Sequence, residues 1–362
     1  MQRLLIVSDP PAKPGYLPRL RYLCDYLVRK GYDVTLLTEV YQELPFAHTY
    51  PIEQIKMYNG SAFDWFIKTV WTLITDWHNR VFAQRALAKM EGRYDVVVCT
   101  AFSDFPLGAA QRIAKAWRVP LVCDIRDLDE QVDDSTYQYK HQNRWLMPFR
   151  RLYRAVHIRR RNRVLRSADA VTTVSKWHAS FIKSLNSNVH VVYNGYDPTV
   201  FYPEDTPTDT FRVSYIGSLS AWQRPALEQI QAVTEVDLHT PTQSPVSFDK
   251  IGEAIRQSSV MIVLTDTHTH GMLTTKFYEA LGCEKPILCV PSDEGELAQM
   301  IAYTQAGITT NDTKKIQAFI DEQYKEWKAK GYTRQPTMHR EQFSRETQCE
   351  LFERILKPLS HD

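Results

Sequence analysis

The sequence contains no long apolar run, no closely spaced cysteines and no large excess of charge of either sign. A helix that spans a bilayer needs about 20 mostly apolar residues, and no such stretch occurs. The six cysteines lie far apart, which argues against a disulfide framework and against a zinc site. Lys and Arg total 44 against 42 Asp and Glu, so the composition gives no reason to expect a nucleic-acid partner.

The first residues, MQRLLIVSDPP, also lack the apolar core and cleavage site of a signal peptide, and they predict a buried strand instead. Scattered cysteines are typical of reduced thiols, so we expect a cytoplasmic protein. No Gly-x-Gly-x-x-Gly fingerprint follows this strand, which argues against a dehydrogenase. In the loop that does follow, Gly15 either makes a turn or lets an acceptor approach, and Arg19 and Arg21 are candidates to meet a phosphate.

Short apolar runs alternate along the chain with segments of helical periodicity, the pattern of strands joined by crossover helices. At about 150 residues per domain, 362 residues predict two domains. We predict strands over residues 4–8, 33–38, 95–100, 121–124, 170–175, 211–216, 235–239, 260–265 and 286–290. We predict helices over residues 19–30, 225–233, 248–257, 275–283, 313–330 and 340–359. Connections of this kind build parallel sheets whose ligand sites lie at the carboxyl ends of the strands.

A polar, proline-rich segment that begins near residue 190 is the best candidate for a linker. We therefore expect one Rossmann-like domain over 1–200, a second over 201–340, and a C-terminal helix over 341–362 that packs back on the first domain. Only the segment TPTQSPVS separates one strand of the second domain from its next helix, so we expect that domain to be shortened. The predicted fold class is α/β, with two Rossmann-like domains facing a cleft.

The segment from 268 to 301 contains a candidate phosphate site. Gly271, Thr274 and Thr275 precede or begin a predicted helix, and Lys276 and Glu279 are three residues apart, which brings them to one face of the first turn. The unpaired amides at a helix N-terminus attract a diphosphate, and Lys276 adds a full charge. Glu279 could accept hydrogen bonds from a ribose. The alternative is an exposed lysine and a glutamate that merely complements the helix dipole.

Five segments resemble retaining, nucleotide-sugar-dependent glycosyltransferases of the GT-B fold, in the large family-four group. Four of them are SADAVTTVSKWHASFI, VVYNGYDPTVFYP, VSYIGSLSAW and TTKFYEALGCEKPIL. The fifth, CDIRDLDE, is similar to an Asp-x-Arg-Asp-Leu segment of enzymes that build bacterial surface polysaccharides. The resemblance implies a UDP- or GDP-sugar donor held by the C-terminal domain, an acceptor approached from the N-terminal domain, and transfer with retained configuration. It implies no other cofactor and no metal.

By this resemblance Glu279 contacts the ribose, Lys276 lies on the phosphate side, and Gly217 and Ser218 close the strand-to-helix turn that faces the donor. The family often has a second glutamate eight residues before Glu279, where this sequence has Gly271. Backbone amides of residues 271–273 could replace it. His268 and His270 are further candidates, although a histidine in a loop is more often solvated.

Charge develops on the β-phosphate when the nucleotide leaves, so we expect Lys276 and a second cation to stabilise it. Arg224 is the candidate for that cation, and its alternative is an exposed charge at a helix start. Asp124, Arg126 and Asp127 follow or end a predicted strand, and they either bind the acceptor or support the loop.

Two further segments suggest a membrane surface. Apolar residues recur at helical spacing between residues 63 and 82, and the stretch from 145 to 166 is strongly basic. Together they favour peripheral binding to an anionic membrane, with a core helix and a solvated basic helix as the alternative. The apolar set is Phe63, Phe66, Ile67, Val70, Trp71, Ile74, Trp77 and Val81.

The sequence thus predicts a glycosyltransferase that moves a sugar from a nucleotide donor to a glycan or lipid-linked acceptor at the cytoplasmic face of a membrane. Two alternatives stay open. A nucleotide-sugar epimerase would hold the same diphosphate and ribose. A non-catalytic partner protein could keep the fold, since fold alone does not determine function.

Overall fold

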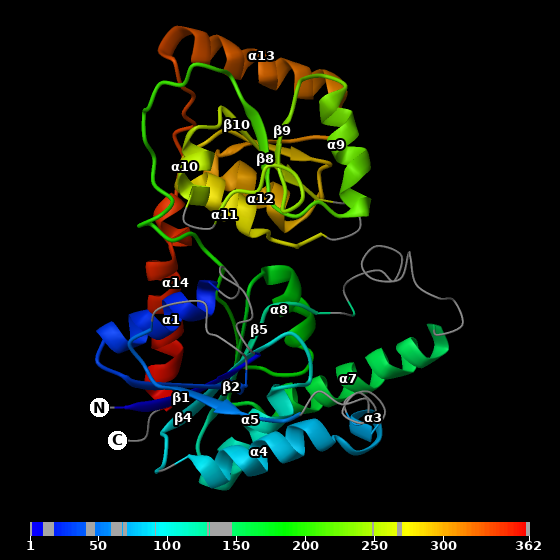
Figure 1. The fold of residues 1–362 in the computed structure, drawn as a ribbon, viewed down its shortest axis with the longest axis vertical. Helices are drawn as coiled ribbons and strands as arrows, with labels where there is room; N and C mark the ends of the chain where they lie inside the picture. Colours follow the sequence, from blue (N-terminus) through cyan, green and yellow to red (C-terminus); the bar gives the residue numbers. More distant parts are fainter. Residues whose placement is uncertain are drawn as a thin grey trace. The chain divides into compact units, whose positions relative to one another are not determined.

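The computed structural model describes residues 2–9, 18–40, 48–58, 67, 71–90, 92–128, 130, 147–247, 250–265 and 270–359. Within these residues the chain forms two compact units (Figure 1). The first unit comprises Met1–Val192 and Cys349–Asp362, and the second comprises Tyr193–Gln348.

The described part of the first unit contains a seven-stranded parallel sheet. Its strands, in spatial order, are β3 (Ile52–Ile55), β2 (Asp33–Glu39), β1 (Arg3–Ser8), β4 (Val96–Ala101), β5 (Leu121–Ile125), β6 (Ala170–Thr173) and β7 (Val189–Val191). The predicted strands of this half are confirmed to within one or two residues. The short strands β3 and β7 were not predicted, because three or four residues carry too little alternation to stand out from a loop.

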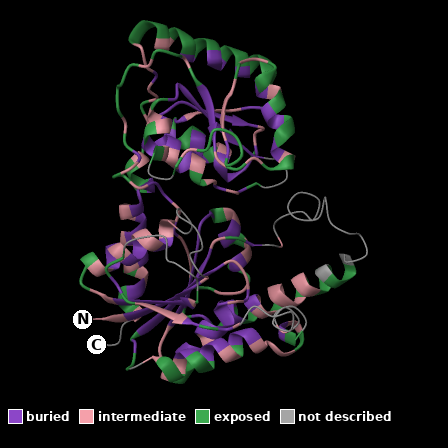
Figure 2. Ribbon diagram, viewed as in Figure 1, coloured by how far each residue is buried: buried purple, intermediate pink, exposed green. Residues whose placement is uncertain are grey.

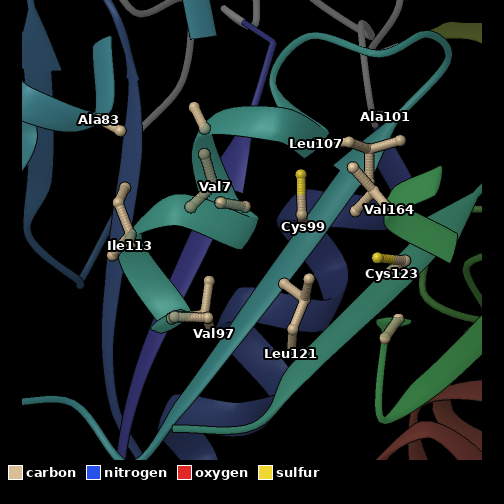
Figure 3. Close-up of a cluster of buried hydrophobic side chains, with 14 of the residues drawn as sticks. Val7, Ala83, Val97, Cys99, Ala101, Leu107, Ile113, Leu121, Cys123 and Val164 are labelled. Atoms are coloured by element: carbon tan, nitrogen blue, oxygen red, sulfur yellow. The ribbon is translucent and has the colours of Figure 1, made fainter. Parts of the chain in front are cut away.

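Helices cover each face of this sheet. Successive side chains of a strand point to opposite faces, so each strand contributes to both layers of packing. On one face Leu5 and Val7 pack with side chains of α4 (Trp77–Lys89) and α5 (Leu107–Trp117), as Figure 3 shows for part of this cluster. On the other face Leu4 and Ile6 pack with α1 (Pro18–Arg29) and α14 (Arg345–Leu356). Figure 2 shows that the residues of the central strands are buried. Such two-sided burial explains why these strands read as continuous apolar runs.

The last helix, α14, begins in the second unit and belongs to the first unit from Cys349 onward. Cys349, Phe352 and Leu356 of α14 lie in the same cluster as Leu23 and Leu27 of α1. The carboxylate of Glu353 also accepts hydrogen bonds from the hydroxyls of Tyr26 at 2.8 Å and Tyr32 at 3.3 Å. A segment more than 300 residues away in the sequence therefore completes the cover over one face of the sheet.

The second unit repeats this architecture with five strands among its described residues. The order is β12 (Gly307–Thr309), β11 (Ile287–Val290), β10 (Val260–Leu264), β8 (Val213–Ile216) and β9 (Asp237–His239), all parallel. One face packs against α11 (Thr275–Gly282) and α12 (Glu296–Thr304), with Ile255 of α10 (Ile251–Arg256). The other packs against α9 (Arg224–Gln231) and α13 (Thr313–Lys330). The smaller sheet agrees with the expectation of a shortened C-terminal domain.

One predicted helix is interrupted. The apolar periodicity between residues 63 and 82 predicted a single helix, but α3 (Thr72–Thr75) ends at Asp76, which has φ 55°, and α4 begins at the next residue. The Asp76 carboxylate accepts hydrogen bonds from Asn79 at 2.8 Å and Arg112 at 2.6 Å, which stabilises the break. Of the predicted apolar set, Phe63, Phe66 and Val70 lie outside the described residues.

The cysteines are as predicted. All six cysteines are buried, and none of them forms a disulfide. Burial raises the pKa of the Cys283 and Cys289 thiols to about 12, so both stay protonated near neutral pH. In the part of the chain that the structure describes, no helix combines the length and apolarity needed to cross a bilayer.

Candidate functional site

The candidate phosphate site of the second unit lies at the start of α11. Thr274 is the N-cap residue, and its hydroxyl oxygen accepts a hydrogen bond from the backbone amide of Lys276 at 3.1 Å. The cap satisfies this one amide and leaves others in the first turn for a ligand. Thr275 is exposed at the first helical position. The predicted start of the helix at Thr275 is therefore confirmed.

The side chain of Lys276 lies directly over Gly217, which follows β8. A Cβ atom added to Gly217 would come within 2.6 Å of Lys276 Cε and 2.9 Å of Nζ. Gly217 has φ +133°, a conformation that other residues rarely adopt, and its amide donates to the carbonyl of His239 at 2.8 Å. The contact between Lys276 and Gly217 joins two segments of the sequence resemblance, VSYIGSLSAW and TTKFYEALGCEKPIL.

Two further interactions define the state of Lys276. Its Nζ lies 5.3 Å from the centroid of the Tyr215 ring, within the range of a cation–π interaction. Burial lowers the pKa of its amine, and the nearby carboxylate of Glu279 opposes that shift. The lysine thus holds a desolvated positive charge at the helix start, where an anion would replace the lost water.

Glu279 lies one turn further along the same face. Burial raises the pKa of its carboxyl group, and the cations of Lys276 and Arg345 act in the opposite direction. Arg345 is itself buried, and its backbone amide donates to Tyr196 at 2.8 Å. Glu279 therefore has cations on two sides, and its oxygens are candidates to accept hydrogen bonds from ligand hydroxyls.

Gly271 lies in a segment that is held against the start of α12. The carbonyl of His270 accepts from the amide of Glu296 at 2.7 Å, and its ring donates through Nδ1 to the carbonyl of Asp293 at 2.8 Å. A Cβ atom on Gly295 would come within 1.9 Å of the His270 carbonyl oxygen, so the approach requires glycine there. His268 lies outside the described residues.

This contact reveals an acidic residue that the sequence analysis missed. Glu296 is 7% exposed, and its carboxylate accepts a hydrogen bond from the Tyr193 hydroxyl at 3.3 Å. The backbone amide of Glu296 contacts the segment that contains Gly271, where the family glutamate is absent. The place of Glu296 in the first turn of a helix is the one signal the sequence offered, and acidic residues in first turns are common.

The other donor-side candidates, Ser218 and Arg224, have fewer side-chain contacts that would fix their positions. The carbonyl of Ser218 accepts a hydrogen bond from the Tyr215 hydroxyl at 2.6 Å, which fixes the turn after β8. Arg224 begins α9 with an exposed side chain, which forms no ion pair or hydrogen bond with the other described residues. A role for Arg224 in charge stabilisation stays a prediction.

In the first unit Asp124 is the centre of a buried polar layer. Thr100, Asp124 and Thr172 are in register on the neighbouring strands β4, β5 and β6. Asp124 is 4% exposed and accepts hydrogen bonds from Thr100 at 3.1 Å and Thr172 at 2.6 Å. Arg19 Nη1 lies 3.0 Å from the same carboxylate. This is the geometry of a carboxylate that positions an arginine, and a catalytic role for Asp124 stays a prediction.

Arg126 follows the same strand and Asp127 comes next with an exposed side chain. The guanidinium carbon of Arg126 lies 3.9 Å from the ring centroid of Phe102, which directly follows β4. Arg19, Asp124 and Arg126 are therefore brought together at the carboxyl ends of adjacent parallel strands, as predicted for a ligand edge. Gly15 lies outside the described residues. No group of His, Cys, Asp and Glu that could hold a metal occurs among the residues the structure describes.

Two parallel α/β units in one chain are the architecture of GT-B glycosyltransferases, and solved structures that resemble this one share it. Sucrose-phosphate synthase from Thermosynechococcus elongatus is 13% identical, with a TM-score of 0.65 over 99% of both chains. HepE from Anabaena, in complex with UDP-glucose, is 13% identical with a TM-score of 0.61 over 99% of this chain and 100% of that one. A glycosyltransferase from Rickettsia africae is 11% identical, with a TM-score of 0.59 over 99% and 98%.

Residues 19–200, half of the chain, match the sequence model of Glycosyltransferase Family 4. The chain belongs to this family and is a glycosyltransferase of the GT-B fold, which confirms the resemblance inferred from its motifs. A comparison with curated protein sequences finds no match. The structural relatives are too distant in sequence to carry more than the fold.

Proposed function

We propose that the protein transfers a sugar from a UDP- or GDP-sugar to a glycan or lipid-linked acceptor, with retention of configuration. The observation that carries this proposal is Lys276, held over Gly217 at the N-terminus of α11 with a partly desolvated charge. That arrangement fits a diphosphate. The UDP-glucose bound by HepE, which has the same fold, supports a nucleotide-sugar donor.

The chemistry assigned to these residues is electrostatic. The bond from the anomeric carbon to the diphosphate oxygen breaks, the acceptor hydroxyl oxygen forms the new bond on the same face of the sugar, and its proton passes to the departing diphosphate oxygen. Lys276 and the first-turn amides of α11 stabilise the negative charge that develops on the diphosphate. Glu279 accepts hydrogen bonds from the ribose hydroxyls, with Lys276 and Arg345 beside it. The proposal therefore assigns no step to a metal.

A thermal-shift screen of the intact chain with UDP, GDP, CMP and dTDP tests the donor assignment. We expect one nucleotide to raise the apparent melting temperature, because a ligand that binds only the folded state stabilises it by mass action. The matching nucleotide-sugar is then incubated with and without acceptor. Sugar transfer supports the proposal, whereas interconversion of the sugar without an acceptor indicates the epimerase, and absence of every shift argues against a donor site.

We further propose that the first unit binds an anionic membrane through a surface on α3 and α7 (Met147–Ser167), here called the α3/α7 patch. Trp71, Ile74, Phe149 and Leu152 are 41%, 69%, 39% and 56% exposed. Arg160 joins the two helices by donating to the carbonyls of Thr72 at 2.8 Å and Leu73 at 2.7 Å. Helix α7 contains eight arginines and no acidic residue. Exposed aromatic and aliphatic side chains beside clustered arginines are typical of surfaces that bind anionic lipids.

The α3/α7 patch predicts a matched pair of variants. Ile74→Glu combined with Leu152→Glu should weaken co-sedimentation with phosphatidylglycerol vesicles by about tenfold or more, because it removes apolar contact and adds negative charge. Val40→Glu makes the same kind of change at a 50% exposed residue that follows β2, and it should leave binding unchanged. Equal binding of these vesicles by the unmodified protein, the double variant and Val40→Glu would contradict this proposal.

A further inference from the structure

The carboxyl end of the first sheet holds a half-buried arginine, Arg126, with two buried donor atoms that have no hydrogen-bond partner among the described residues. The Arg126 guanidinium stacks on Phe102, which fixes its plane and leaves its N–H groups pointing outward along the edges of that plane. Its Nε and Nη2 are buried and have no hydrogen-bond partner within the described structure. A buried donor without an acceptor costs about 1–3 kcal/mol, and more for a charged group. A ligand that supplies oxygen acceptors would recover this loss.

A second arginine is held beside it. Arg19 lies in the first turn of α1, and its guanidinium pairs with Asp124 at 3.0 Å. That carboxylate also accepts from Thr100 and Thr172, so its oxygens are largely occupied within the polar layer. Since the layer is set by strand register, Arg19 is positioned before any ligand arrives.

The charges around Arg126 define what can bind. Burial lowers the pKa of its guanidinium, the Arg19 cation acts in the same direction, and Asp124, Asp127 and Asp9 oppose them. Asp9 and Asp127 each have an interaction of their own. The donors without acceptors therefore belong to the arginine, and the group that satisfies them must carry oxygen lone pairs.

We infer that Arg126 and Arg19 form a binding site for a phosphate group carried by the acceptor. This inference rests on the proposed function, in which the first unit receives the acceptor, and it adds the chemical class of that acceptor. The planar fork of an arginine matches the spacing of two phosphate oxygens. The loops at the carboxyl ends of parallel strands are where α/β folds bind ligands. A sugar phosphate and a polyprenyl-linked phosphate share this chemistry.

Calorimetric titration of the full chain with pyrophosphate tests the site. Because the donor site also binds diphosphates, the titrations are made in the Lys276→Met background. Arg126→Gln should weaken pyrophosphate binding at least tenfold there. Arg93→Gln, which removes an exposed arginine in the loop before β4, should have no effect. Affinity for pyrophosphate that is the same in both variants would overturn the inference.

A second variant guards against misfolding. Arg126→Lys keeps the charge and loses the planar fork, so it should also bind pyrophosphate more weakly while its circular dichroism stays native. The failure of this inference is distinguishable from the failure of the donor site. Pyrophosphate binding that depends on Lys276 but not on Arg126 supports the donor site and overturns the acceptor site, and the reverse dependence does the opposite.

Competition experiments identify the source of the phosphate. A hexose phosphate in solution, or vesicles that contain a polyprenyl phosphate, should displace pyrophosphate from the Lys276→Met chain, and displacement by either one supports the site. Displacement by a neutral methyl glycoside at the same concentration would overturn the inference, because the subsite would then recognise hydroxyl groups and not phosphate.

Discussion

Lys276→Met is expected to weaken nucleotide-diphosphate binding by about 10- to 100-fold. A hydrogen bond to a charged group contributes about 1.5–3 kcal/mol, and a tenfold change in affinity corresponds to about 1.4 kcal/mol. Methionine has a similar length and carries no charge. Because burial already disfavours the charged form of the Lys276 amine and lowers its pKa, the free energy of unfolding should not fall. Isothermal titration with the nucleotide selected by the screen measures the loss.

Two pairs of variants control this result. Lys315→Met changes an exposed lysine of α13 and should leave nucleotide affinity unchanged.

Gly217→Ala places a methyl group 2.6 Å from Lys276 Cε, so it should displace the lysine and reduce nucleotide affinity although Lys276 itself is intact. Gly31→Ala is the matched control, because Gly31 also has positive φ but nothing lies within 4 Å of its added Cβ. Unchanged affinity in both Lys276→Met and Gly217→Ala would refute the donor site.

Asp124→Ala is expected to destabilise the first unit by about 3–5 kcal/mol. Removing one member of a buried ion pair leaves the other charge desolvated without compensation, and here two threonine hydroxyls lose their acceptor as well. Urea unfolding followed by circular dichroism, analysed for the transition of the first unit, measures the change.

The exposed ion pair between Arg3 and Asp33 provides the control for this prediction. Both side chains are more than a third exposed, at 38% and 34%, and their atoms lie 3.1 Å apart. Asp33→Ala should cost less than about 1 kcal/mol, because solvent screens such pairs. A loss of stability for Asp124→Ala as small as that for Asp33→Ala would show that the polar layer contributes little to folding.

The donor-side geometry was largely predictable because its information is local. A helix places residues three apart on one face, so the order Thr274, Lys276 and Glu279 already specifies a cap, a cation and an acid at one helix start. What the sequence did not specify is the glycine under the lysine. Gly217 lies some sixty residues earlier, and its contact with Lys276 depends on β8 pairing with β10.

The acceptor-side geometry depends on register between strands far apart in the sequence. Thr100, Asp124 and Thr172 share a layer because three strands align at those positions, and a shift of one residue would turn each side chain to the opposite face. No local pattern predicts that alignment. No local pattern predicts the contact of Phe102 with Arg126 either, because it depends on the pairing of β4 with β5.

The sequence by itself determined the α/β alternation, the family, and the caps and charges of α11, because apolar periodicity and short-range spacing express these directly. The tertiary structure decided which apolar side chains stay exposed. Trp77 and Val81 pack against the core of the first unit, whereas Trp71 and Ile74, before the break at Asp76, are exposed. The tertiary structure also decided which charged residues contact one another. Burial and contact between distant strands depend on the whole packed sheet, and a periodicity of a few residues does not contain that information.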